Sequence, residues 1–244
     1  MKQELESNLK LDNSVFRNKI RSEKIPKYYF GPLHVLFNAA LLFGSIIFHA
    51  KSLQAPELIH FTPFIIIIFL GNLAVFFIHK YPLHGRFKWN SYAYANHTKT
   101  HHVFYTEENV TWKDTRDWYT MFFPPEIVFA FIVLYHPIFY YLLKPVIGSN
   151  TTHTFLMASS CYFILYEIIH FTSHLPSKHP LLKIPFLRMM RRHHQIHHSP
   201  RLMGHYNFCI VFPLVDHLLG TFVDDNRYKV LTGKDAPGNG DTPN

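Results

Sequence analysis

Cysteine is nearly absent from this chain of 244 residues, which contains Cys161 and Cys209 and no Cys-x-x-Cys pair. A disulfide framework or a thiolate metal site needs more cysteines at closer spacing, so both are excluded. Acidic residues are also scarce, because 16 Asp and Glu stand against 24 Lys and Arg, which gives a formal charge of +8. Such a charge suits nucleic acid or an anionic membrane surface. No nucleic-acid-binding motif accompanies the charge, which favours the membrane.

Apolar residues make up an ordinary 48% of the chain, but they are gathered into a few long runs. Four runs approach the roughly 20 residues that a membrane-spanning helix needs. They are Leu33–Ala50, Leu58–His79, Pro124–Leu143 and Thr152–Phe171. The links within the first and second pairs are short, so the sequence predicts an all-α integral membrane protein with four transmembrane helices in two hairpins. The alternative, two pairs of buried helices in a soluble protein, is disfavoured by the length of the runs.

The distribution of basic residues predicts the orientation of these helices. If all four runs cross the membrane, the amino-terminal segment, residues 80–123 and the region after Phe171 share one side and hold 22 of the 24 Lys and Arg. The two short links on the other side hold Lys51 and Lys144. Basic residues collect on the cytoplasmic side of membrane proteins. Both chain ends are therefore expected in the cytoplasm.

Three segments follow from this pattern. Residues 1–30 are polar, long and basic, unlike a secretory signal peptide, and are expected to form a basic cytoplasmic arm. Residues 31–222 are expected to form the membrane domain. Residues 223–244 are polar and rich in Gly and Pro, and are expected to be a disordered tail.

Histidine is the most over-represented residue, with 19 copies. Ten of them fall into four clusters with spacings His-x4-His, His-x3-His-His, His-x3-His and His-x2-His-His. These candidate metal ligands are His79, His84, His97, His101, His102, His170, His174, His194, His197 and His198. All four clusters fall on the cytoplasmic side of the predicted topology, where they would form a histidine-rich helical cap.

The spacing of the clusters predicts how the imidazoles pair. Residues three or four apart share one face of an α-helix. Each of three pairs is therefore expected to direct both of its imidazoles at one position: His97 with His101, His170 with His174, and His194 with His197. His102 and His198 lie about 100° further round and would serve a second ion. Neutral imidazole binds iron, zinc and copper, and ten ligands suit two ions at about five each.

The polar residues outside the ten candidate ligands are expected to support the ligands or to lie at the surface. Soluble di-iron bundles use two Glu-x-x-His motifs and further carboxylates. Within the four histidine clusters Glu167-Ile-Ile-His170 is the single match, so a carboxylate-bridged site is disfavoured. The expected outer partners of the ligands are Glu167, Asp216 and His193. The remaining histidines are interpreted as polar, interfacial or surface side chains, or for the last three as outer partners: His34, His49, His60, His136, His153, His179, His205 and His217.

The order of these clusters resembles the fatty acid hydroxylase superfamily, also called the sterol desaturase family. Tyr166-Glu-Ile-Ile-His-Phe-Thr-Ser-His174, His193-His-Gln-Ile-His-His198 and Pro213-Leu-Val-Asp-His-Leu-Leu-Gly-Thr221 are most similar to fatty acid 2-hydroxylases. The second cluster has three histidines where those enzymes usually have two, Val215 replaces a usual Trp, and no cytochrome b5 domain is present. The resemblance covers about residues 60–222.

The resemblance implies a non-haem di-iron monooxygenase that uses dioxygen and two electrons to hydroxylate a lipid acyl chain, at carbon 2 in the most similar branch. Two iron ions would be the cofactors, with zinc an alternative occupant in purified protein and no haem on this chain. Electrons would come from cytochrome b5 or ferredoxin with a reductase. A bacterial inner membrane is favoured over the endoplasmic reticulum. The alternatives are a sterol desaturase or methyl oxidase of the same superfamily and, in another class, a histidine-rich metal transporter.

Overall fold

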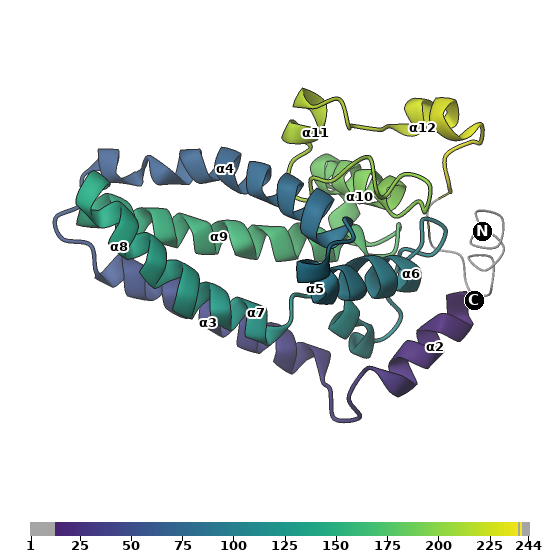
Figure 1. Ribbon diagram of the computed structural model, residues 1–244, viewed down its shortest axis with the longest axis horizontal. Helices are drawn as coiled ribbons and strands as arrows, with labels where there is room; N and C mark the ends of the chain where they lie inside the picture. The colour runs from purple at the N-terminus through teal and green to yellow at the C-terminus, as the bar shows by residue number, and fades with distance from the viewer. Residues whose placement is uncertain (1–12, 239, 241–244) are drawn as a thin grey trace. The chain divides into compact units, whose positions relative to one another are not determined.

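The computed structural model describes residues 13–238 and residue 240, and within them the chain is helical with no β-strand. Thr106 and Asn109 form one isolated antiparallel bridge. The longer helices are α2 (Asn13–Glu23), α3 (Gly31–Lys51), α4 (Pro63–Ile78), α7 (Pro125–Ala130), α8 (His136–Ile147), α9 (Ser149–Ser173), α10 (Pro185–His197) and α12 (Asp225–Thr232). They are drawn in Figure 1. The all-α prediction is confirmed for this part of the chain.

Four helical stretches are long and apolar enough to cross a membrane, as the sequence predicts. They are Gly31–Lys51, Leu58–Leu83, Pro125–Ile147 and Ser149–Ser173. The second joins the 3-10 helix η1 (Leu58–Phe61), α4 and the π-helix η2 (His79–Leu83). The third joins α7, the π-helix η6 (Phe131–Tyr135) and α8. This π-turn precedes Pro137, whose ring removes a backbone donor from the helix.

The described chain divides into two compact units, where the sequence predicts one domain over residues 31–222. The membrane unit comprises Gly31–Ala74 and Phe122–Ile168. The histidine unit comprises Met1–Phe30, Val75–Met121 and Ile169–Asn244. All ten candidate ligands belong to the histidine unit.

The membrane unit exposes many apolar side chains and buries several polar ones. Ile65 of α4 is 76% exposed, and Phe48 of α3 and Leu142 of α8 are also exposed. Asn38 of α3 and Thr152 of α9 are buried instead. Lipid solvates apolar side chains, so this inverted arrangement is stable in a bilayer and unfavourable in water. The four stretches that span this unit therefore suit a membrane protein.

The histidine unit is built from helical segments joined by loops. They are η2, η3 (Lys88–Asn90), α5 (Ser91–Asn96), the π-helix η4 (His97–His101), α6 (His102–Phe104), η5 (Thr115–Thr120), η7 (Pro180–Lys183), α10, α11 (Leu214–Leu218) and α12, together with α2 and the ends of α4 and α9. Ile196, Leu202, Val223 and Tyr228 form a buried apolar cluster within it.

Both terminal segments contain a helix. In the expected basic arm, α2 buries Arg17 and Ile20. In the expected disordered tail, Asp224 caps the start of α12 and Gly233 ends it in the left-handed conformation, with φ 68°. The tail prediction is therefore wrong for Asp225–Thr232, because Tyr228 supplies an apolar anchor that composition alone conceals. Residues 1–12, 239 and 241–244 lie outside the described part of the chain.

Candidate metal centre

The first two histidines are positioned by a π-turn at the end of α4. His79 opens η2 directly after Ile78, and the backbone N–H of His84 donates to the carbonyl of His79 at 3.2 Å. This bond spans five residues, so it closes a wider turn than an α-helix and places residues five apart on one face. The two ring centroids are consequently 5.0 Å apart.

A second π-turn organises the next cluster. It runs over η4, and the N–H of His102 donates to the carbonyl of His97. Nε2 of His102 is 3.1 Å from Nε2 of His97, again between residues five apart. Both His-x4-His pairs among the ten candidate ligands therefore meet across a π-turn.

Nine of the ten candidate ligands gather into two groups. In each group the ligand atoms all lie within 4.8 Å of one another. The first group is His79, His84, His97, His102 and His197, and the second is His101, His170, His174 and His194. Representative contacts are 2.8 Å between Nε2 of His79 and His97, and 3.1 Å between Nε2 of His194 and His174.

His198 lies beside both groups. Its Nε2 is 3.0 Å from Nε2 of His194, in the second group. Its ring stacks on that of His102, in the first group, with centroids 4.2 Å apart. The structure therefore brings all ten predicted histidines into one neighbourhood, with His198 between the two groups.

The expected pairing is correct for one cluster and wrong for two. His170 and His174 meet as predicted, with Nε2 atoms 3.3 Å apart. His97 and His101 fall into different groups, because the π-turn pairs His97 with His102. His194 and His197 are also divided, since His194 meets His198 one α-helical turn later while His197 faces Nε2 of His84 at 3.1 Å.

An orphaned nitrogen at His101 tests whether these residues fit a metal ion. Nδ1 of His101 lies 2.9 Å from the carbonyl of Thr120, and a carbonyl accepts only from N–H, which assigns the proton to Nδ1. Nε2 of His101 then carries a lone pair. It is buried and has no hydrogen-bond partner. A buried acceptor without a partner costs free energy, and a bound cation would satisfy it.

The same backbone anchoring recurs at four other ligands. Each Nδ1 lies within 2.5 to 2.9 Å of a backbone carbonyl, which leaves Nε2 unprotonated and turned towards other histidines. The pairs are His79 with Phe208, His174 with Val110, His197 with Tyr206, and His198 with Tyr105. Facing lone pairs repel one another unless a cation lies between them. The ligand set is nitrogen without carboxylate, which fits iron, zinc or copper rather than magnesium or calcium.

The electrostatics of the centre keep its imidazoles neutral. Burial lowers the pKa of His84 to about 2 and that of His101 to about 4, with neighbouring histidines adding to the effect. Burial likewise holds the pKa of His102, His174 and His194 well below the usual range. Neutral imidazole is the form that binds a metal ion, so the site is prepared for a cation at neutral pH.

Two of the three expected outer partners act as a pair. Nε2 of His193 is 3.2 Å from Oδ2 of Asp216, and both side chains are buried. Burial acts to raise the pKa of Asp216, but hydrogen bonds from His193, Thr221 and Cys209 outweigh it and lower the pKa to about 2. Asp216 also accepts from the backbone N–H of Phe208 at 3.0 Å. Because the carbonyl of Phe208 anchors His79, Asp216 supports that ligand through the backbone.

Glu167 contacts the backbone rather than an imidazole. Its Oε1 accepts from the N–H of Phe123 at 3.1 Å, and its Oε2 is buried without a hydrogen-bond partner. This contact lies within the membrane unit. The expectation that Glu167 orients a ligand imidazole therefore has no contact to support it.

Arg17 supports the candidate site in a way that the sequence did not reveal. It is 1% exposed, and its guanidinium donates to the carbonyls of Phe104, Asn109 and Thr111 at 2.7, 2.9 and 3.0 Å. The neighbouring carbonyls of Tyr105 and Val110 are those that anchor His198 and His174. Arg17 therefore organises the loop that orients two of the candidate ligands. A lone arginine in a basic segment carries no sequence signal for this role.

Comparison of the chain with protein-family models, with curated proteins and with solved structures found no match. The class of protein is therefore defined by its own geometry. In its described residues the chain is all-helical, with four candidate membrane spans and buried histidine clusters that could hold a metal ion.

The metal-free protein is expected to lose stability as the pH falls below about 6.5, the ordinary pKa of histidine in an unfolded chain. Eight candidate ligands outside the spans have folded-state pKa values lowered by burial. Their contribution is complete above pH 6.5 and is lost on acidification, by about 1.4 kcal/mol per pH unit for each histidine that stays neutral. Melting temperatures measured from pH 8 to pH 5 in detergent should fall steeply below pH 6.5.

A bound metal ion is expected to delay this loss, because it must be displaced before the imidazoles take up protons. Zinc-loaded protein should therefore keep its melting temperature to a lower pH than metal-free protein. Identical, flat melting temperatures between pH 7 and pH 5 in both forms would contradict the neutral, buried state of these histidines.

Proposed function

We propose that this protein is a membrane-bound, histidine-ligated di-iron monooxygenase that hydroxylates a C–H bond of a lipid acyl chain. One atom of dioxygen would enter the alcohol, and the other would leave as water with two electrons and two protons. Carbon 2 of a fatty-acyl or sphingolipid chain is the position that the sequence resemblance suggests. The observation that carries the proposal is the pair of histidine groups, whose Nε2 atoms converge without a carboxylate.

Each part of the centre has a definite role in this proposal. Two iron ions held by the two groups would supply dioxygen activation. The backbone carbonyls fix the ring orientation of His79, His101, His174, His197 and His198, so that the ligands need little rearrangement on binding. Burial keeps the imidazoles unprotonated and limits the access of water.

The two longest candidate spans support a lipid substrate. His79 follows α4 without interruption, and His170 lies within α9. Two ligands therefore belong to helices that are themselves apolar enough to cross a bilayer. An acyl chain in the membrane would approach the centre along such helices, whereas a transporter would carry its ligands near the middle of the membrane.

We further propose that the four spans form two hairpins, with the histidine unit and both chain ends on the cytoplasmic side. The distribution of 22 basic residues against Lys51 and Lys144 supports this orientation. An external donor, cytochrome b5 or ferredoxin with its reductase, would deliver the electrons on that side. A bacterial inner membrane is the proposed location.

Expression with a ferredoxin and reductase, under ¹⁸O₂ and with iron supplied, tests the reaction. The expected result is a lipid species heavier by one ¹⁸O atom, located on the acyl chain by tandem mass spectrometry. Desaturated or sterol products would instead assign the chain to the desaturase or methyl oxidase branch. The product should disappear when His170 or His197 is replaced with alanine.

His205 offers a matched control, because it is exposed and belongs to neither group. His205→Ala should leave the labelled product unchanged. Unaltered lipids in cells whose purified protein is fully iron-loaded, with a competent donor present, would overturn the proposed function.

A further inference from the structure

Three histidines that are far apart in the sequence meet inside the membrane unit. His49 of α3, His136 of α8 and His153 of α9 were expected to be isolated polar or interfacial side chains, and this expectation is wrong. Nδ1 of His49 is 3.0 Å from Nδ1 of His153, and Nε2 of His49 is 2.9 Å from Nδ1 of His136. The three side chains are between 5% and 7% exposed. Ionisable groups buried among membrane helices are costly, and they commonly mark ion or proton pathways.

Two hydroxyl groups extend the histidine contacts. Nε2 of His136 is 3.4 Å from Oγ of Ser160, which is 3.2 Å from Oγ of Ser45. Oγ of Ser45 also lies 3.3 Å from Nδ1 of His136. The imidazole chain therefore consists of His153, His49, His136, Ser160 and Ser45, in that order.

The geometry of the imidazole chain differs from that of the metal centre. The two nitrogens of an imidazole point to opposite sides of the ring. Because His49 meets His136 and His153 through different nitrogens, the three rings cannot address one ion through His49. At the metal centre the Nε2 atoms converge instead. Contacts through both sides of a central ring are those of a hydrogen-bonded chain.

The number of hydrogens in the imidazole chain determines how many extra protons it can bind. Three neutral imidazoles carry three N–H groups, one for each of the two ring-to-ring contacts and one for Ser160 or for the outer nitrogen of His153. One added proton makes His49 an imidazolium that donates to both neighbours, and every contact is kept. A second added proton would place two hydrogens in one nitrogen-to-nitrogen contact. The chain thus accommodates one extra proton.

We propose that His153, His49 and His136 form a proton-binding relay in the membrane unit, which takes up one proton from the side of the α8–α9 turn. The proton forms an N–H bond on His153, and the Nδ1–H of His153 passes to His49. The Nε2–H of His49 then passes to His136, which donates to Ser160. No oxidant or reductant is needed, and the relay does not depend on the proposed oxidation.

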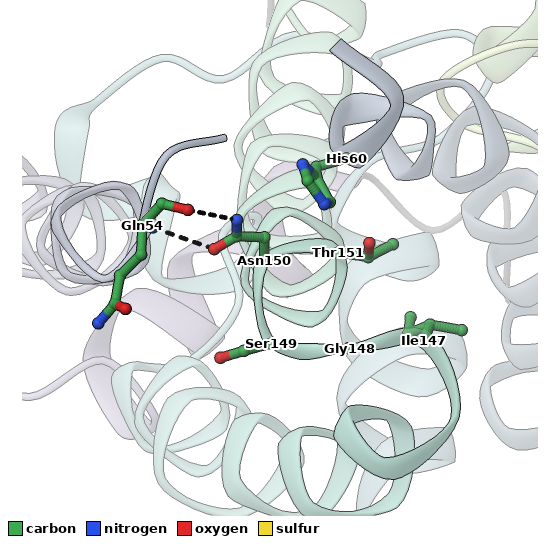
Figure 2. Close-up of a pocket in the computed structure, with 7 residues that line it drawn as sticks. All are labelled: Gln54, His60, Ile147, Gly148, Ser149, Asn150 and Thr151. Carbon is green, nitrogen blue, oxygen red and sulfur yellow. Dashed lines mark hydrogen bonds between the residues drawn. The ribbon is translucent and has the colours of Figure 1, made fainter. Parts of the chain in front are cut away.

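A polar pocket lies at the α8–α9 turn, the side from which the relay is proposed to take up its proton (Figure 2). It is a cavity of about 350 Å³ at the α8–α9 turn, and Gln54, His60 and Ser149 are among its lining residues. Asn150 on its wall accepts from the backbone N–H of Gln54 at 3.0 Å and donates to the Gln54 carbonyl at 2.7 Å, which fixes this edge. Polar walls of this kind admit water.

His153 lies one helical turn along α9 from the pocket residue Ser149. The ring centroid of Tyr140 in α8 is 5.1 Å from that of His153. The ammonium of Lys144 lies 5.2 Å from the centre of the Tyr140 ring. Its positive charge repels a proton held at His153, which favours transfer of the proton to the inner rings, His49 and His136. Tyr135, whose ring centroid is 5.8 Å from that of His136, faces the inner end of the relay.

Proton uptake by zinc-loaded protein in lipid nanodiscs tests the relay without any oxygen chemistry. An indicator dye would record the protons bound per chain when the pH is lowered from 8 to 5. The triple variant His49→Gln, His136→Gln and His153→Gln is expected to bind one proton fewer than the wild type. A difference of three would show independent histidines, and a difference of zero would show a permanently neutral network; either result overturns the proposal.

Single variants keep the test decisive if the triple variant does not fold. His49→Gln alone should also remove one proton, and unchanged uptake would refute the relay. His153→Gln should leave the proton count unchanged but slow uptake about tenfold, because the proton must then cross an apolar gap. His60→Gln is the matched control, since His60 lines the same pocket but is not part of the imidazole chain. It should not alter the rate of proton uptake. Equal rates in the His153 and His60 variants would exclude entrance through His153. The zinc-loaded protein performs no oxidation, so failure here and failure of the proposed hydroxylation are distinguishable.

Discussion

Replacing His174 with alanine is expected to reduce the metal content of the protein from two ions per chain to one. The second group then keeps three imidazoles, and the carbonyl of Val110 loses the N–H that it accepts at 2.6 Å. Loss of an outer partner alone costs about 10- to 100-fold in metal affinity, so loss of a ligand should cost at least as much. Iron and zinc measured by mass spectrometry after dialysis against a mild chelator would give the content.

His84→Ala provides the comparison within the first group. Four imidazoles remain there after the substitution, so the affinity for the ion should fall less than in His174→Ala. His205→Ala should retain both ions. If His174→Ala kept two tightly bound ions, the second group could not be a metal site, whatever the activity of the variant.

The four candidate membrane spans could be predicted almost completely from sequence. Each predicted span overlaps a helical stretch of the structure, and the differences are at the ends. Leu58–His79, for example, extends to Leu83 because the π-turn η2 continues the helix beyond the apolar run. Long apolar runs predict membrane helices well, because the thickness of the bilayer sets one dominant length.

The histidine neighbourhood was predictable as a set, but its internal pairing was not. The predicted pairing assumed an α-helix, in which residues three or four apart meet. Nothing in the sequence indicates the π-turn that brings His97 to His102. The imidazole chain was missed for a different reason. His49, His136 and His153 share no spacing, and only the packing of α3, α8 and α9 brings them together.

Arg17→Met is expected to lower the affinity for one of the two proposed metal ions by about 10- to 100-fold, the range found when outer partners of metal ligands are removed. The methionine keeps much of the apolar volume but leaves the carbonyls of Phe104, Asn109 and Thr111 without their donor. The loop between them also carries the carbonyls that anchor His174 and His198. The second group contains His174, so its ion should be affected, while the first group should keep its affinity. Competition with a chromogenic zinc chelator would separate the two affinities.

Arg21→Met is a matched control on the same helix. Arg21 lies about one turn from Arg17 and pairs with Asp117 at 2.7 and 2.8 Å, so its loss removes the same charge without removing a donor to the carbonyls of the anchoring loop. It should lower the melting temperature and leave both metal affinities within a small factor of wild type.

Arg17→Lys keeps the charge but not the forked geometry that reaches several carbonyls, so it should restore the lost metal affinity only in part. An equal loss of both ions in Arg17→Met, with a matching fall in the melting temperature of the metal-free protein, would show that Arg17 supports the unit as a whole. A selective loss would show that it positions the ligands of one group, and that α2 belongs functionally to the metal centre.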